Sequence, residues 1–227
     1  MTRFIPYKKY SGSENMSIDL SILNESIKTN AQPVLRLYGW LKPTLSIGRN
    51  QPLTGINIDY CKTNNIDIIK RPTGGRAVLH DKELTYSFIT PVDFLKNGQT
   101  VVSSYKEISE ALIFGFKKFD INLSFPASKK VSVRNNFCMA ISTGADLNYM
   151  EKKIIGSAQF RKQNYILQHG SILIDLDKCV VENIFNSKNA DKNLITLTEI
   201  NPEITNIEIL SKAVIAGFNK KFGFDFK

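Results

Sequence analysis

Residue types that mark specialised chemistry are scarce in this sequence. Its 227 residues include three cysteines and two histidines. Cys61, Cys138 and Cys179 have neither the close spacing of metal ligands nor the even, clustered pattern of a secreted disulfide framework. We therefore predict that the protein has no metal site and works in the cytoplasm.

Long apolar runs and common nucleotide motifs are also absent. No segment approaches the roughly 20 apolar residues of a membrane-spanning helix, and residues 1–9 lack the apolar core of a signal peptide. There is no Walker loop, no Gly-x-Gly-x-x-Gly after a strand-like run, no His-Glu-x-x-His and no Gly-x-Ser-x-Gly. Because no linker or repeat divides the chain, we predict one domain over residues 1–227 and no membrane partner.

Acidic residues are outnumbered by basic ones. The 30 lysines and arginines against 21 aspartates and glutamates give a net charge of +9. Nucleic acid, an anionic membrane surface and an acidic protein would each be attracted by such a charge. The basic residues are dispersed, however, and no nucleic-acid motif accompanies them. We therefore rank an acidic protein partner or substrate first and nucleic acid second.

Hydrophobic periodicity predicts strands interspersed with helices. Strands are expected at residues 3–10, 34–40, 44–48, 145–150, 153–158 and 165–175. Helices are expected at residues 14–28, 59–64, 104–119, 178–185 and 205–222. This order lacks regular βαβ alternation, so it predicts an α+β fold in which helices flank a mixed, largely antiparallel sheet.

Several local patterns refine this prediction. The strand at 44–48 follows a turn and is expected to form a hairpin with 34–40, and Gly170 is expected to break the last strand. Capping boxes predict helix starts at Ser104 and Thr205. In the first helix the apolar stripe leaves Asp19 on the opposite, polar side.

The stretch from Lys70 to Ser87 is the densest in polar chemistry. Gly74 and Gly75 can adopt positive φ and allow a ligand to approach the backbone. Arg71 and Arg76 offer guanidinium groups that suit an acidic ligand. A binding loop between buried strands is the interpretation that we favour; the alternative is a Pro-Gly hairpin with ordinary surface charges.

Cys138 is the candidate nucleophile, because basic neighbours such as Arg134 favour the reactive thiolate. Lys153 follows on a predicted hairpin that could return it toward Cys138, where it would hold the thiolate or accept its proton. Taken alone, each residue is more commonly structural: a packed thiol and an exposed lysine. For His80 and His169 we favour hydrogen-bonded, orienting roles over a metal pair.

Four segments together resemble the catalytic domain of the lipoate/biotin protein ligase superfamily, and they cover roughly residues 15–185. They are Leu35-x-Leu37-Tyr38-Gly39-Trp40, Arg71-Pro72-Thr73-Gly74-Gly75-Arg76-Ala77-Val78-Leu79-His80-Asp81, Lys153-x-x-Gly156-Ser157-Ala158-Gln159 and Leu167-Gln168-His169-Gly170-Ser171. Within the superfamily, the chain is most similar to the cysteine-dependent octanoyltransferases. Cys138 precedes Gly156 by 18 residues, as the nucleophile does in those enzymes.

The resemblance implies a fold, a reaction and a site. The fold is that of a lipoate/biotin protein ligase-like catalytic domain, and no cofactor is implied. Octanoyl would pass from acyl carrier protein to Cys138, and then to a lysine of a lipoyl domain or of the glycine-cleavage H protein, with assistance from Lys153. Nucleic acid is not an implied partner. The implied substrate-binding residues are Tyr38, Trp40, Arg71, Gly74, Gly75, Arg76, His80, Gly156, Ser157, Ala158, His169 and Gly170.

Three alternatives stay open. The segment Ser46–Gln51 is more similar to the loop of ATP-dependent lipoate-protein ligases, and the residues after Cys138 lack the Phe-Asp-x-Pro of close transferases. An amidotransferase would use the same cysteine to move octanoyl between lipoyl domains. A binding module without catalysis is disfavoured by the intact Cys138 and Lys153. In each enzymatic case we expect an apolar tunnel for the acyl chain, lined by Trp40, Leu79 and Tyr86.

Overall fold

The computed structural model describes residues 2–126, 146–188 and 191–227. Its strands are β1 (Arg3–Tyr10), β2 (Val34–Trp40), β3 (Thr44–Ile47), β4 (Asp67–Lys70), β5 (Val78–His80), β6 (Glu83–Pro91), β7 (Leu147–Tyr149), β8 (Lys152–Lys162) and β9 (Tyr165–Leu173). Its α-helices are α1 (Gly12–Thr29), α2 (Ile58–Thr63), α3 (Val101–Phe116), α4 (Lys178–Phe185), α5 (Leu197–Ile200) and α6 (Ile207–Phe222).

Six of these strands form the main sheet, in the order β1-β2-β6-β9-β8-β7. Strands β1 and β2 are parallel, and all the other neighbours in this sheet are antiparallel. A smaller sheet has the order β4-β3-β5, with β3 parallel to β4 and antiparallel to β5. The prediction of a mixed, largely antiparallel α+β fold is confirmed.

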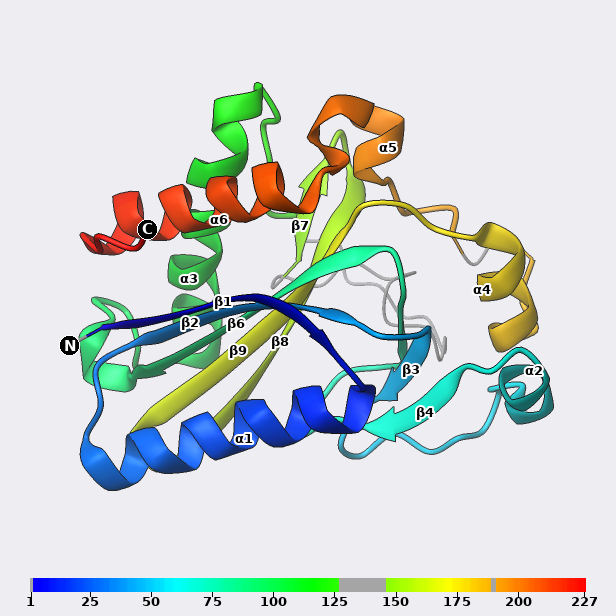
Figure 1. Ribbon diagram of the computed structural model, residues 1–227, viewed down its shortest axis with the longest axis horizontal. Coiled ribbons are helices and arrows are strands. Elements are labelled where there is room, and N and C mark those ends of the chain that lie inside the picture. Colours follow the sequence, from blue (N-terminus) through cyan, green and yellow to red (C-terminus); the bar gives the residue numbers. More distant parts are fainter. Residues whose placement is uncertain (1, 127–145, 189–190) are drawn as a thin grey trace.

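Helices cover the two faces of the main sheet, with α1 on one face and α3 and α6 on the other (Figure 1). Strand β2 shows how the sequence produces this arrangement. Leu35 and Leu37 point into the core under α3 and α6, whereas Val34 joins the cluster under α1. Because side chains alternate along a strand, Arg36 and Tyr38 lie on the α1 side with Val34. The polar residues of β2 therefore face α1, and the candidate site forms there.

The small sheet packs with α2 and α4 at one end of the main sheet (Figure 1). Leu45 from β3, Cys61 from α2 and Val181 from α4 are all fully buried in this second core. Cys61 thus packs as a small apolar residue. Of the helices in the described ranges, none has the length and apolar character needed to span a bilayer.

The predicted hairpin between residues 34–40 and 44–48 is wrong. Strand β3 pairs with β4 and β5 in the small sheet, and β2 pairs with β1 and β6 in the main sheet. The physical reason is burial: Leu45 and Ile47 pack in the second core rather than beside β2. A turn after a strand therefore led the chain out of the sheet instead of reversing it within the sheet.

Other boundaries also differ from the prediction. The stretch Lys70–Ser87 contains the strand β5. Gly170 does not break β9, because it pairs with Tyr86 on one side and with Ser157 on the other. Strand β8 continues to Lys162, past the predicted end of the strand at residue 158. Pairing along the whole length of β9 extends both strands.

The two capping-box predictions are displaced. Helix α3 starts at Val101, and its N-cap is Thr100, whose hydroxyl accepts a hydrogen bond from the backbone N–H of Ser103. Ser104 lies inside the helix. Helix α6 is capped by Asn206, one residue after Thr205, and Gly223 ends it in the left-handed conformation with φ of 71°. Glycine is common at this position because it adopts positive φ without a steric penalty.

Candidate active site

A pocket lies between α1, the main sheet and the small sheet. Helix α1 contributes one apolar side chain, Met16, and strand β2 contributes the aromatic residues Tyr38 and Trp40. The remaining lining residues come from β3, β5, β6, β8, β9 and the segment between β4 and β5. They are Ser46, Arg71, Val78, His80, Thr85, Gly156, Ser157, Ala158, His169, Gly170 and Ser171.

Most of the predicted substrate-binding residues line this pocket, although they come from distant parts of the chain. Those that do are Tyr38, Trp40, Arg71, His80, Gly156, Ser157, Ala158, His169 and Gly170. Gly74, Gly75 and Arg76 are not among the lining residues, and neither are Leu79 and Tyr86, which were expected in the tunnel wall. The structure therefore brings most of the predicted residues together around one pocket, while their role in binding stays a prediction.

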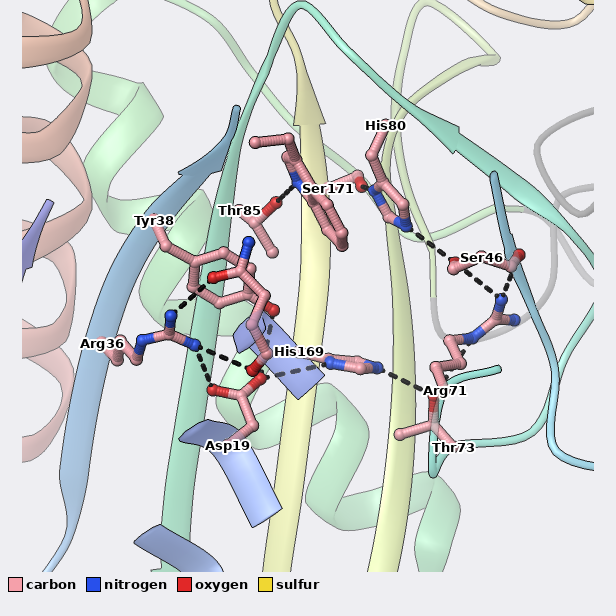
Figure 2. A network of polar contacts seen from close by, with 12 residues as sticks. Asp19, Arg36, Tyr38, Ser46, Arg71, Thr73, His80, Thr85, His169 and Ser171 are labelled. Carbon is pink, nitrogen blue, oxygen red and sulfur yellow. Dashed lines mark hydrogen bonds and ion pairs between the residues drawn. The ribbon is translucent and has the colours of Figure 1, made fainter. Parts of the chain in front are cut away.

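Below the pocket, a buried ion pair joins α1 to the sheet (Figure 2). Asp19 and Arg36 are 0% and 1% exposed, and their Oδ1 and Nη1 atoms are 2.6 Å apart. The Tyr38 hydroxyl donates a hydrogen bond to the second carboxylate oxygen of Asp19 at 3.1 Å. Arg36 also donates to the side-chain oxygen of Asn15 at 2.6 Å. These bonds place α1, and with it Met16, against the pocket.

His169 continues the network from Asp19 to the loop after β4. Its Nδ1 atom lies 3.6 Å from Asp19 Oδ2, and its Nε2 atom lies 2.8 Å from the Thr73 hydroxyl. Thr73 accepts a hydrogen bond from Arg71 Nε, so its own hydroxyl proton can be donated to His169. The neutral imidazole with its proton on Nδ1 fits this arrangement.

The Arg71 side chain forms hydrogen bonds within the protein rather than projecting into solvent. Its guanidinium donates to the Ser46 carbonyl at 2.9 Å, to the Gly74 carbonyl at 2.8 Å and to the Arg76 carbonyl at 2.6 Å. The side chain is 4% exposed. Arg71 thus holds the shape of the loop between β4 and β5, and a second role toward an acidic ligand stays a prediction.

The loop between β4 and β5 contains Gly75, for which the sequence suggested a positive φ. Gly75 has φ of 94°, in the region that favours glycine. A Cβ atom at Gly48 would lie 1.9 Å from the Gly75 carbonyl oxygen, so the loop after β3 packs directly against Gly75. At Gly74, by contrast, a Cβ atom would meet nothing within 4 Å. The close approach of the two loops therefore depends on Gly48 and Gly75.

A second polar cluster surrounds His80 on the other side of the pocket. His80 Nε2 is 2.7 Å from the Ser46 hydroxyl, and Nδ1 is 2.9 Å from Glu83 Oε1. Glu83 also accepts hydrogen bonds from Trp40 Nε1 at 3.1 Å and from the Ser171 hydroxyl at 2.8 Å. Both histidines are thus hydrogen-bonded between protein groups, as the sequence analysis favoured.

Burial sets the protonation of this site. Burial lowers the pKa of His169, against the opposing effect of Asp19. Burial also raises the pKa of Tyr38 well above its ordinary value, and the Asp19 carboxylate adds to that increase. For Glu83, burial favours the neutral acid, but His80 and the hydroxyl donors outweigh it and lower the pKa. At neutral pH, therefore, His169 and Tyr38 are neutral and Glu83 is ionised.

Lys153 lies on β8, three residues before Gly156, and it is buried. Its side chain is 1% exposed, and its Nζ atom is 3.0 Å from Asp146 Oδ2, which is 2% exposed. The prediction that Lys153 is a functional rather than an exposed residue is consistent with this burial, but its catalytic role stays a prediction. Lys153 is not among the lining residues of the pocket.

Cys138, the predicted nucleophile, lies outside the described residues. Of the other two cysteines, Cys61 is buried in the second core and Cys179 is exposed on α4. Within residues 2–126, 146–188 and 191–227, no group of three or more His, Cys, Asp or Glu side chains could hold a metal ion.

Sequence analysis missed several residues of the site. Asp19 was placed on the polar side of α1, yet it is fully buried against Arg36. Thr85 and Ser171 also line the pocket unpredicted. The available signal was the alternation of strands: Ser171 lies two residues after His169 on β9 and must share its face.

Comparison with known proteins agrees with this geometry. The model of a family described as the lipoyl protein ligase A/B catalytic domain matches residues 11–221. An octanoyltransferase, LipM, from Carboxydothermus hydrogenoformans is 42% identical over 176 residues, covering 77% of this chain and 65% of that protein. LipM from Macrococcus caseolyticus is 36% identical over 242 residues, covering 99% of this chain and 87% of that protein. LipM from Clostridioides difficile is 36% identical and covers 99% and 88%, respectively.

Solved structures with similar folds carry ligase titles. A lipoate-protein ligase A bound with ATP has a TM-score of 0.79 at 23% identity, covering 100% of this chain and 87% of that chain. A putative lipoate protein ligase from T. acidophilum with bound lipoic acid has a TM-score of 0.77 at 23% identity, covering 100% and 88%. At such identities the likeness establishes the fold alone.

Proposed function

The chain belongs to the lipoyl protein ligase A/B catalytic-domain family, and we propose that it transfers octanoyl groups in lipoate biosynthesis, from acyl carrier protein to a lysine of a lipoyl domain or of the glycine-cleavage H protein. The protein is an acyltransferase. The observation that carries this conclusion is the 36% identity to an octanoyltransferase over 99% of the chain. We place the reaction in the cytoplasm.

The proposed reaction has two steps. The Cys138 thiolate attacks the carbonyl carbon of the donor thioester, and the thiolate of the carrier arm leaves with the bonding electrons. The acceptor lysine, as a neutral amine, then attacks the enzyme thioester, so that an amide forms and the Cys138 thiolate leaves. The amine loses one proton in the second step, and the departing carrier thiolate gains one after the first. Neither step consumes ATP.

The pocket supports an acyl substrate. Met16, Trp40, Val78 and Ala158 provide apolar surface for a hydrocarbon chain. Burying each CH₂ group contributes about 0.8 kcal/mol, so a pocket of fitted length distinguishes octanoyl from shorter chains. Gly156 and Gly170 form part of the pocket wall on β8 and β9.

Charge supports an acidic protein partner. The chain carries a net charge of +9, and a basic enzyme attracts acidic carriers and acceptors over long range. Long-range attraction of this kind influences the association rate more than the final affinity.

One experiment distinguishes this function from its alternatives. The protein is incubated with octanoyl-acyl carrier protein in the absence of ATP, and its intact mass is measured. We expect an octanoyl adduct on the wild type and none on Cys138→Ser. Cys179→Ser, which removes an exposed cysteine on α4, is the matched control and should retain the adduct.

Two further arms test the alternatives. A ligase would show no adduct from the carrier protein but would modify a lipoyl domain from free lipoate and ATP. An amidotransferase would be acylated by an octanoylated lipoyl domain and not by the carrier protein. Transfer that persists in Cys138→Ser would remove the cysteine from the mechanism.

The ligase alternative has one observation in its favour, namely the loop Ser46–Gln51. In the structure, the Arg49 guanidinium lies 5.6 Å from the centre of the Phe160 ring on β8, and the Arg49 backbone N–H donates to the Thr73 carbonyl. This loop therefore closes the small sheet against β8. The interaction gives Arg49 a structural function that needs no nucleotide.

A further inference from the structure

The stability of the fold does not by itself explain why Asp146 and Lys153 form a buried ion pair. Both side chains are nearly inaccessible, and their charged atoms are 3.0 Å apart. Removing two charges from water costs several kcal/mol per ion, and well-packed apolar residues would often stabilise a fold as well or better. A buried pair in a site is therefore a candidate for function.

The backbone around each partner is fixed independently. Lys153 N–H donates to the Asn193 carbonyl at 2.8 Å, and the Lys153 carbonyl accepts from Ile195 N–H at 3.0 Å. On the other side, Asn148, two residues after Asp146, exchanges two backbone hydrogen bonds with Ser124. The two strands β7 and β8 are thus held from outside, and the ion pair joins side chains whose backbones are already in place.

The pair lies behind the wall of the pocket. Ser157, a lining residue, shares a 2.8 Å hydrogen bond between its hydroxyl and that of Tyr86. Burial raises the pKa of Tyr86 to about 12, and the negative charge of Asp146 contributes to that increase. The charge of Asp146 therefore has an electrostatic effect on the hydroxyl that hydrogen-bonds to Ser157. Lys153 and the wall residues Gly156 and Ser157 belong to the same strand, β8.

We propose that Asp146 is a positioning residue, which holds the ammonium group of Lys153 in the orientation that acyl transfer requires. This inference rests on the proposed function, because it assumes that Lys153 takes part in transfer. A lysine ammonium is a point charge on a flexible stem with three donors. The ion pair with Asp146 restricts that stem, so the orientation of the ammonium group is determined before substrate binds.

A double-mutant cycle tests the proposal. The rate of single-turnover transfer from octanoyl-acyl carrier protein to a lipoyl domain is measured for the wild type, Asp146→Asn, Lys153→Met and the double variant. We expect Asp146→Asn to lower the rate roughly 100-fold, the scale of a misplacement of about 1 Å. In the Lys153→Met background the same substitution should have no further effect, because Asp146 would act only through Lys153.

The matched control is Asp175→Asn. Asp175 also forms an ion pair with a lysine, at 2.8 Å from Lys82, but its side chain is 40% exposed. This variant should transfer octanoyl at the rate of the wild type. Circular dichroism and thermal unfolding of each variant separate a loss of rate from a loss of fold. If Asp146→Asn does not fold, the cycle uses Asp146→Glu, which keeps the charge and moves it by one methylene, with an expected loss of roughly 100-fold on the same scale.

Two results would overturn the proposal: full activity in a folded Asp146 variant, or rate losses that multiply in the double variant. Full activity of Lys153→Met would also reject it, while the Cys138 adduct would still support octanoyl transfer. If the wild type forms no adduct with the carrier protein, the proposed function fails on its own. The same cycle is then measured on ATP-dependent modification of the lipoyl domain.

Discussion

The imidazole ring of His80 lies parallel to the indole ring of Trp40, with ring centroids 4.0 Å apart and an interplanar angle of 11°. The two residues are also joined through Glu83, which accepts hydrogen bonds from both. Trp40 thus presents an apolar face to the pocket and a polar edge to the buried carboxylate. One side chain links the surface that suits an acyl chain to the network that supports it.

Replacing Trp40 with Phe should separate these two functions. The ring surface is retained, but Glu83 and Thr85 lose the indole N–H as a donor. We expect the free energy of unfolding to fall by about 1–3 kcal/mol, measured by urea denaturation. Trp40→Leu should cost roughly 0.5–1.5 kcal/mol more, because the stacking on His80 is lost too. Equal stability of Trp40→Phe and the wild type would contradict this assignment.

The ion pair of Asp19 with Arg36 should contribute far more than the surface pair on the same helix. Asp19→Asn leaves Arg36 buried without its charged partner, and we expect a loss of about 3–5 kcal/mol. Glu25 on α1 pairs with Arg3 at 3.8 Å, with side chains 62% and 46% exposed. Glu25→Gln should therefore change stability by less than about 1 kcal/mol. Similar losses for the two variants, measured by chemical denaturation, would show that α1 is not anchored through Asp19.

Gly170 and Gly74 form a second matched pair. A Cβ atom at Gly170 would lie 2.5 Å from Ser157 Oγ and 2.6 Å from the Tyr86 ring. We expect Gly170→Ala to destabilise the fold by about 1–3 kcal/mol through overpacking and to weaken octanoyl transfer. A Cβ atom at Gly74 meets nothing within 4 Å, so Gly74→Ala should change stability by less than about 0.5 kcal/mol. Thermal unfolding of both variants checks this difference.

His169 should make stability depend on pH in the acidic range. Burial lowers its pKa in the folded protein, so below the unfolded value of about 6.5 the unfolded chain binds a proton that the folded protein does not. Its contribution is therefore complete above about pH 6.5 and is lost as pH falls toward the lowered value. The slope approaches about 1.4 kcal/mol per pH unit for one proton.

The comparison with His169→Gln isolates this contribution. Urea midpoints are measured from neutral pH downward for both proteins. The stability of the wild type should fall more steeply with decreasing pH than that of the variant, since Gln does not titrate. Parallel curves would mean that His169 binds protons equally in the folded and unfolded states.

Much of the site could be predicted because its residues form short contiguous patterns. Gly156, Ser157 and Ala158 lie together in the sequence, as do His169 and Gly170, and all of them line the pocket. The buried charges could not be predicted in the same way. The burial of Asp19 depends on Arg36, 17 residues away on another element, and helical periodicity does not encode such a partner. Likewise, the sequence did not distinguish Lys153 from an exposed lysine. Its buried contact with Asp146 in the structure did so.

By itself, the sequence determined the class of fold, the family and most of the pocket lining, because these depend on local periodicity and contiguous motifs. The tertiary structure alone decided that β3 pairs in the small sheet and that Arg71 donates hydrogen bonds to carbonyls of its own loop. It also decided that Asp146 contacts Lys153. Those outcomes depend on which apolar surfaces pack together and which buried charges find partners. Both are long-range contacts, and their free energies are not determined by any local pattern.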